Sequence, residues 1–321
     1  MPSLLPSLLP RTLRSIPRLT PASLTPRIAI LPRCTPTLAV TRTMATVPST
    51  TKTPHTSASS TPLPMLPEFA LTDNIILVTG GARGLGLTQS SAFISAGATV
   101  YVLDRLEEPD KDFVRLREKV GGEVLHYRHL DVTSPDTLQK TIRSIGEHHG
   151  RIDGLLAAAG INIDKPALEY SKSEVDRVFE VNATGVLLTA QAVAAEMIRH
   201  GNGGSIVLVA SMSGTVANRE LPCAAYNASK AAVLQMARNL AAEWGEHNIR
   251  VNTLSPGYIL TPMTEHDFKR PERERQLSGA NMLGRLSTPE EYRGAALFLL
   301  SGASSFMTGA DLRIDGGHSA W

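Results

Sequence analysis

The chain has 321 residues, of which 42% are hydrophobic and 19% are charged. This is enough apolar material for one core of ordinary size, and it is the composition of a globular protein. The formal net charge is +2, yet every basic residue before Glu68 stands in a segment without acids. Beyond Glu68, Lys and Arg are interspersed with Asp and Glu, which excludes a basic patch for nucleic acid.

Cysteine usage and hydropathy exclude two further classes of protein. Cys34 and Cys223 are the two cysteines, so no disulfide framework can be argued from their spacing, and a reducing compartment fits that usage. The longest apolar runs, residues 75–78 and 206–210, are far shorter than the roughly 20 residues that cross a bilayer. We expect no membrane-spanning segment.

Residues 1–66 form a leader rich in Pro, Ser, Thr, Leu and Arg, which we expect to be disordered because proline recurs too often for a long helix. Scattered Arg and hydroxyl residues without acids are typical of a mitochondrial transit peptide. The prolines weigh against the amphipathic helix that such peptides use. The alternatives are an unstructured tail, or translation from Met44 and a cytosolic product.

From residue 67 to 321, short β-rich apolar runs alternate with segments of helical period, which predicts one α/β domain with a parallel sheet. We expect strands at 75–79, 99–103, 123–129, 153–157, 204–210, 249–255 and 311–315. We expect helices near 84–96, 110–120, 134–149, 171–199, 225–247 and 289–301. Seven strands and their helices fit a single doubly wound, Rossmann-type domain.

A glycine-rich turn follows the first predicted strand and opens the first predicted helix. Such a turn lets the backbone approach a dinucleotide pyrophosphate, and free N–H groups at the helix N-terminus favour the anion. The spacing is G-x-x-x-G-x-G rather than G-x-G-x-x-G, and a purely structural turn is the alternative. The expected cofactor contacts here are Gly80, Arg83, Gly84, Leu85 and Gly86.

The second predicted strand ends at Asp104, where a carboxylate can hold a ribose 2′-OH, and this favours NAD. Arg83 and Arg105 weigh against this preference for NAD, because either side chain could bind the extra phosphate of NADP. Asp131 and Val132 follow the third strand and are expected near the adenine. An Asp at that place is equally a turn former or a helix cap.

Tyr226 and Lys230 are four residues apart in a long helical segment and therefore share one helix face. An ammonium beside a phenol stabilises the phenolate and lowers its pKa, so that Tyr226 can act as general acid or base. Taken alone, the Tyr226 and Lys230 pair is equally well explained as part of a solvent-exposed helix face. Its context is the strand at 204–210, which leads to Ser211 and places hydroxyls at the same sheet edge as Gly80.

These features together resemble the short-chain dehydrogenase/reductase family. The family marks are a T-G-x-x-x-G-x-G turn, a Ser after the fifth strand, Y-x-x-x-K and a later P-G. Here they stand at 79–86, Ser211, 226–230 and 256–257. The resemblance covers residues 70–321, and four motifs in order are far more specific than any one of them.

The resemblance implies a role for each matching residue. Tyr226 would be the proton donor or acceptor, and Lys230 would tune it and bind the nicotinamide ribose. Ser211 would hold the substrate oxygen, with Ser213 as its competitor. Asn182 would position a water in the proton relay, its alternative being an ordinary polar helix residue.

Further cofactor contacts follow from the same resemblance, with one departure from the family pattern. Gly160 ends the stretch Ala-Ala-Ala-Gly, where the family has N-N-A-G, so no side-chain amide braces the sheet there. Pro256, Gly257, Ile259 and Thr261 complete the expected cofactor site. Thr261 would contact the nicotinamide carboxamide, or else cap a short helix.

For the substrate, the chain looks like the fungal polyol and ketose branch of the family, and Asp104 looks more like its D-arabinitol type than its NADP-linked mannitol type. Asn218, Arg219 and Glu220 could bond polyol hydroxyls or be solvated loop residues. Residues 260–287 are charged and irregular, as in a mobile lid. Cys223 is expected to be structural, and no His cluster suggests a metal.

The expected activity is hydride transfer between NAD, or alternatively NADP, and a polyol or ketose. The alternative enzyme is a reductase of an acyl-thioester or a secondary-metabolite ketone, since one fold serves many carbonyls. A non-catalytic cofactor sensor is the alternative from another class. The resemblance also implies a homotetramer.

Overall fold

The computed structural model describes residues 66–219, 221–264 and 271–321. They contain a seven-stranded parallel sheet with strand order β3-β2-β1-β4-β5-β6-β7. The strands are β1 (Ile75–Thr79), β2 (Thr99–Asp104), β3 (Leu125–His129), β4 (Gly154–Ala157), β5 (Gly204–Val209), β6 (Ile249–Pro256) and β7 (Asp311–Ile314). This confirms the predicted Rossmann-type fold. The order reverses between β1 and β4, which is where such sheets bind ligands.

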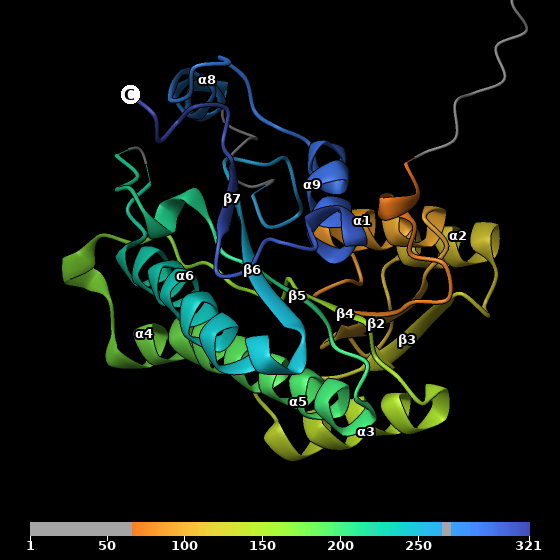
Figure 1. Cartoon of the computed structure of the whole chain (residues 1–321). Coiled ribbons are helices and arrows are strands. Elements are labelled where there is room, and N and C mark those ends of the chain that lie inside the picture. The colour runs from red at the N-terminus through yellow and green to blue at the C-terminus, as the bar shows by residue number, and fades with distance from the viewer. Residues whose placement is uncertain (1–65, 220, 265–270) are drawn as a thin grey trace, which may run out of the picture. The chain divides into compact units, whose positions relative to one another are not determined.

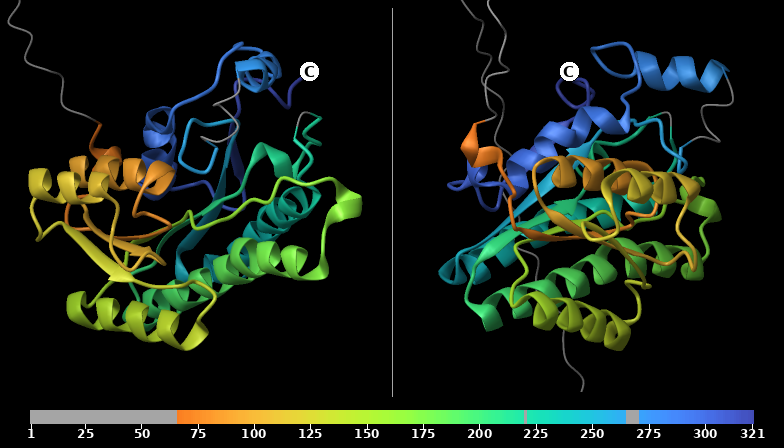
Figure 2. Two further views of the ribbon diagram at one scale, coloured as in Figure 1. Left: turned by 180° about the vertical axis from the view of Figure 1, so that it is seen from behind. Right: turned by 90° about the vertical axis from the view of Figure 1, so that its right-hand side faces the viewer.

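Helices cover both faces of the sheet and make three layers (Figures 1 and 2). One face carries α3 (Pro135–His149), α5 (Gly185–His200) and α6 (Ala224–Trp244), and the other carries α1 (Gly84–Ser95), α2 (Lys111–Val120) and α9 (Arg293–Leu300). Each face has its own apolar core. The central strands are therefore buried on both sides, which is why β1 reads as a continuous apolar run rather than an alternating one.

The segment predicted as one helix over 171–199 is divided. It consists of α4 (Lys172–Phe179), a π-helical turn (Glu180–Thr184) and α5. The turn carries Asn182, which is buried. Single π turns within helices are frequent at functional sites, because they redirect side chains without ending the helix.

A second difference lies in the segment expected to be an irregular lid. Residues Pro271–Gly279 form helix α8, in which Leu277 is the buried residue. Its sequence shows no apolar stripe, so periodicity could not reveal it. Residues 265–270 lie outside the described part of the chain, as do residues 1–65 of the predicted leader.

The remaining predicted elements differ at their ends. The predicted strand at 123–129 begins at Leu125, after the glycine pair that ends α2. The predicted helix at 225–247 is α-helical to Trp244 and ends in a short 3₁₀ turn, and the one at 289–301 begins with a 3₁₀ turn. Other short 3₁₀ turns are Pro67–Phe69, Ala167–Glu169, Met212–Gly214 and Gly302–Ser304.

One continuous helical run, Lys172–His200, is long and apolar enough by composition to cross a membrane. Half of its apolar window is buried inside the domain. The α5 part packs against α3, α6 and the sheet, so its apolar residues serve the core. This packing agrees with the expectation that the run does not span a membrane.

Candidate active site

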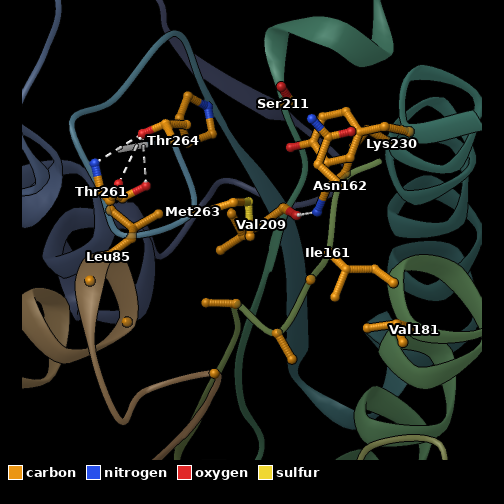
Figure 3. Close-up of a pocket in the computed structure, with 18 of the residues that line it drawn as sticks. Leu85, Ile161, Asn162, Val181, Val209, Ser211, Lys230, Thr261, Met263 and Thr264 are labelled. Atoms are coloured by element: carbon orange, nitrogen blue, oxygen red, sulfur yellow. Dashed lines mark hydrogen bonds between the residues drawn. The ribbon is translucent and has the colours of Figure 1, made fainter. Parts of the chain in front are cut away.

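A cavity of about 840 Å³ opens at the carboxyl edge of the sheet, beside the β1–β4 switch point (Figure 3). Sequence motifs that are up to about 180 residues apart meet there. The predicted site residues that line it are Gly80, Arg83, Gly84, Leu85, Gly86, Asp104, Asp131, Val132, Gly160, Ser211, Tyr226, Lys230, Pro256, Gly257, Ile259 and Thr261. Asn182 lies behind the cavity wall instead.

The glycine-rich turn between β1 and α1 is built for close backbone approach. A Cβ on Gly86 would lie 2.5 Å from the carbonyl oxygen of Gly80, so no larger residue fits without a shift. Gly84, at φ +58°, begins α1, and no side chain of the described residues caps that helix. Its first N–H groups are therefore available to an anion, which fits a dinucleotide pyrophosphate.

Asp104 ties the glycine turn to the end of β2. Its Oδ2 accepts a hydrogen bond from the Ala82 N–H at 3.0 Å, and its Oδ1 accepts one from the Leu106 N–H at 3.2 Å. A carboxylate offers about four acceptor positions, so capacity remains for ribose hydroxyls. Arg83 and Arg105 also line the cavity and are exposed, so a 2′-phosphate has two cations within the same site.

Asp131 serves a local turn as well as the cavity. Its Oδ1 accepts hydrogen bonds from the N–H and the hydroxyl of Thr133, at 2.9 and 2.8 Å. The backbone hydrogen bond from Thr133 is the main cause of a lowered Asp131 pKa. Val132 packs against Gly185, where a Cβ would lie 2.8 Å from its Cγ2.

Tyr226 and Lys230 lie one turn apart on α6, beside the end of β5. The Lys230 ammonium donates a hydrogen bond to the Val209 carbonyl at 2.8 Å and lies 5.7 Å from the centre of the Tyr226 ring. Ser211 follows β5, and its hydroxyl lowers the pKa of Tyr226, which sets the two groups close together. Ser213 is also buried and lines the cavity, but the effect on Tyr226 favours Ser211 as the substrate-binding hydroxyl.

The pKa of Tyr226 differs from the sequence-based expectation. Burial raises it to about 12, and the Ser211 hydroxyl only partly opposes that rise. Burial also lowers the pKa of Lys230 to about 8. Lys230, which the sequence analysis expected to lower the Tyr226 pKa, is not among the causes of this shift, and desolvation of the phenol is the largest of them.

Asn182 clamps the segment after β4 to the catalytic helix. Its Oδ1 accepts from the Ile161 N–H at 2.8 Å, and its Nδ2 donates to the Ile161 carbonyl at 2.9 Å and to the Ser229 hydroxyl at 3.0 Å. Ser229 immediately precedes Lys230. The Thr79 hydroxyl also accepts from the Ala159 N–H at 3.3 Å. These contacts brace the sheet edge where the family amide is missing.

Of the three residues that the sequence offered as candidate polyol contacts, Asn218 and Arg219 do not line the cavity. Asn218 is buried, and its Nδ2 donates to the Tyr258 hydroxyl at 3.1 Å. Arg219 is exposed away from the cavity, and Glu220 lies outside the described residues. Cys223 does line the cavity, but burial raises the pKa of its thiol to about 12, which agrees with a structural role.

Other residues in the cavity wall were not identified from sequence. Asn162 follows the fourth strand, Arg177 comes from α4, and Thr264 comes from the loop after β6 (Figure 3). The Thr264 hydroxyl lies 3.0 Å from the Thr261 N–H, from which it accepts, and so holds the loop that carries Thr261. The sequence signal that could have identified Asn162 is its position, since it is a polar residue two positions after Gly160 at the end of a strand.

Among the described residues, no group of three or more His, Cys, Asp or Glu side chains could hold a metal ion. Ser211, Tyr226 and Lys230 supply polar side chains to this site, beside a glycine-rich anion cradle. A hydroxyl, a phenol and an ammonium in one cavity can bind a carbonyl or alcohol oxygen and move its proton.

Comparisons with known proteins agree with this geometry. The sequence model of the family described as "Enoyl-(Acyl carrier protein) reductase" matches residues 80–319. The "Short chain dehydrogenases/reductase notP'" of Aspergillus versicolor is 42% identical over 261 residues, covering 79% of this chain and 89% of that protein. The ribulose-forming D-arabinitol 2-dehydrogenase of Candida tropicalis is 35% identical over 271 residues, covering 80% of this chain and 96% of that one.

A solved structure extends the agreement to three dimensions. The gluconate 5-dehydrogenase of Burkholderia cenocepacia J2315, in complex with NADP and tartrate, is 31% identical and superposes with a TM-score of 0.74. The match covers 79% of this chain and 98% of that one. With the glycine turn, Ser211, Tyr226 and Lys230 in one cavity, the chain belongs to the short-chain dehydrogenase/reductase family and is an NAD(P)-dependent oxidoreductase.

Proposed function

We propose that the protein interconverts a polyol and a ketose, with D-arabinitol and ribulose as the reference pair and NAD as the preferred cofactor. The observation that carries this proposal is the cavity in which Ser211, Tyr226 and Lys230 meet the glycine-rich turn. The D-arabinitol 2-dehydrogenase of Candida tropicalis supports the substrate class, because this chain matches 96% of its length.

The cavity residues divide between holding the cofactor and handling the substrate. Gly80, Gly84 and Gly86 would receive the pyrophosphate, and Asp104 would accept hydrogen bonds from the adenine ribose. When bound, the nicotinamide ring supplies the hydride acceptor or donor. Lys230, whose Nζ lies 3.6 Å from the position of a Cβ on Gly160, would hold the nicotinamide ribose.

Proton transfer in the oxidation direction is the task of Tyr226. Ser211 would donate a hydrogen bond to the substrate oxygen and hold it next to the phenol. Tyr226, as phenolate, takes the hydroxyl proton while the carbinol carbon loses its hydrogen as hydride. The Lys230 charge stabilises the phenolate, and the reverse reaction returns the proton from Tyr226 to the carbonyl oxygen.

An assay of purified protein against D-arabinitol, mannitol, sorbitol and xylitol, each with NAD and with NADP, tests the proposal. Turnover of at least one polyol, faster with NAD, is the expected result. Absence of turnover for all four, with cofactor still bound, would reject the polyol proposal in favour of a non-sugar ketone or an acyl-thioester.

Asp104 gives the cofactor preference a test of its own. Asp104→Ala should lower the ratio of kcat/KM with NAD to kcat/KM with NADP by about tenfold or more, since charge-assisted hydrogen bonds are worth 1.5–3 kcal/mol. The variant also loses the hydrogen bond from the Ala82 N–H, which should lower kcat/KM with both cofactors alike. The ratio of the two kcat/KM values removes this common effect. An unchanged ratio would assign cofactor choice to Arg83 and Arg105.

We also propose that residues 1–66 direct the protein to mitochondria, on the composition of that segment. A fluorescent protein fused to residues 1–66 should enter mitochondria. The same fusion beginning at Met44 should stay in the cytosol. Cytosolic signal from both fusions would refute targeting by the leader.

A further inference from the structure

Behind the cavity wall, four side chains from two distant segments form a continuous chain of hydrogen bonds. The Cys223 thiol donates to Asn227 Oδ1 at 3.0 Å, and Asn227 Nδ2 donates to Asn218 Oδ1 at 2.9 Å. Asn218 Nδ2 then donates to the Tyr258 hydroxyl oxygen at 3.1 Å. Each group gives its hydrogen to the next one, so the chain has a single direction.

A backbone carbonyl and the Cys223 thiol set the direction of this chain. Burial raises the pKa of the thiol to about 12, so it keeps its proton and can donate to Asn227 Oδ1 and to the Leu221 carbonyl, at 3.0 and 3.3 Å. Asn227 Nδ2 also donates to the Val216 carbonyl at 3.3 Å, which fixes its amide nitrogen toward Asn218 and its oxygen toward Cys223. Both amides are therefore held in one orientation, because a flip would place two donors or two acceptors together.

The far end of the chain fixes Tyr258, which the sequence analysis did not single out. Its carbonyl oxygen accepts from the N–H and the hydroxyl of Ser287 at 3.0 and 2.8 Å, and its ring meets the His318 ring edge-on, with centres 5.4 Å apart. Asn218 and His318 thus contact the Tyr258 side chain, and Ser287 holds its backbone. Packing and hydrogen bonds on several sides leave a side chain little rotamer freedom.

Tyr258 lines two cavities. It lines the catalytic cavity of about 840 Å³ and, together with Gly257, a second cavity of about 60 Å³. Tyr258 lies at the substrate end of the catalytic cavity, because its hydroxyl is hydrogen-bonded to Asn218, whose partner Asn227 directly follows Tyr226.

We infer that Tyr258 is the specificity-determining wall of the substrate end of the cavity, and that Asn218 is the positioning residue that holds it there. The inference rests on the proposed polyol activity. It assigns to Asn218 an indirect role, in place of the two alternatives from sequence, a direct polyol contact or a solvated loop residue. The length of polyol that the cavity accepts then depends on the Asn218–Tyr258 hydrogen bond, although Asn218 does not contact the substrate.

The test compares four variants of the full-length protein by their ratio of kcat/KM for five-carbon over six-carbon polyols. Asn218→Leu and Tyr258→Phe each remove the hydrogen bond, and each should change that ratio about fivefold, as expected for one neutral hydrogen bond. The double variant should change it by less than the product of the two single changes, because the Asn218–Tyr258 hydrogen bond that both substitutions remove can be lost only once. Asn218→Asp should restore the wild-type ratio, since its carboxylate accepts from the Tyr258 hydroxyl.

Arg219→Gln is the matched control, because Arg219 is the exposed neighbour of Asn218 and does not line the cavity. It should leave both kcat/KM values unchanged. Asn218→Leu lowering kcat/KM equally for all polyols, or additive effects of Asn218→Leu and Tyr258→Phe, would overturn the inference alone. A wild-type protein that oxidises no polyol would overturn the proposed function and, with it, the inference.

Discussion

Tyr226 carries the proton in the proposed reaction, and its replacement isolates that step. Tyr226→Phe should lower kcat by about 10²–10⁴-fold, the usual contribution of a general acid or base. The cofactor should still bind, because the glycine turn and Asp104 remain. Steady-state assays measure kcat, and titration of NADH fluorescence measures cofactor binding. Activity within a few fold of wild type would contradict the mechanism.

The pKa values of the catalytic pair predict opposite pH responses in the two directions. Oxidation needs Tyr226 without its proton, so kcat/KM for the alcohol should rise with pH from 6 upward, because burial raises this pKa to about 12. The rise should become shallower above about pH 8, where Lys230 loses the charge that stabilises the phenolate. Reduction needs Tyr226 protonated and should change little near neutrality.

Measurement of kcat/KM in both directions from pH 6 to 10 checks these signs. The Tyr226→Phe variant is the control, because its residual activity should lose the rising limb. An oxidation rate that falls between pH 6 and 8 would show that a group other than Tyr226 accepts the proton.

At the scale of elements, the turn from β1 into α1 depends on backbone contact rather than on a side chain. Gly86→Ala should destabilise the protein by about 1–3 kcal/mol, as overpacking does, and should weaken cofactor binding, because the added Cβ would meet Gly80. Thermal unfolding and NADH titration measure the two effects.

Gly294 in α9 offers the matched control. Nothing lies within 4 Å of a Cβ placed there. Gly294→Ala should therefore be neutral or stabilise the helix by up to about 1 kcal/mol. If Gly86→Ala behaved like Gly294→Ala, the close approach at the turn would have no energetic importance.

For the whole molecule, the family resemblance predicts a homotetramer, and α5 presents an apolar surface that such an assembly could bury. Leu187 and Ile198 are both more than a third exposed on this helix. Sedimentation should show a tetramer, and Leu187→Glu combined with Ile198→Glu should reduce the assembly, since buried unpaired charges are costly. A monomeric wild type would remove the prediction.

The sequence by itself determined the fold and most of the candidate site. Doubly buried strands such as β1 are apolar throughout, and helices such as α3 bury one face, so local patterns carry the parallel α/β architecture. The motif residues then meet because the carboxyl ends of parallel strands share one edge. Topology alone brings Gly80, Ser211 and Tyr226 into one cavity.

Only the tertiary structure decided what depends on contacts between distant segments. Asn218 binds Tyr258, which is 40 positions away, and Asn182 binds Ser229, which is 47 away, and no local spacing encodes either pair. Helix α8 lacks an apolar stripe. The raised pKa of Tyr226 comes mainly from burial by the folded domain, and the adjacent Lys230 in the sequence does not predict it. Side-chain spacing along one helix is local, whereas desolvation is a property of the folded molecule.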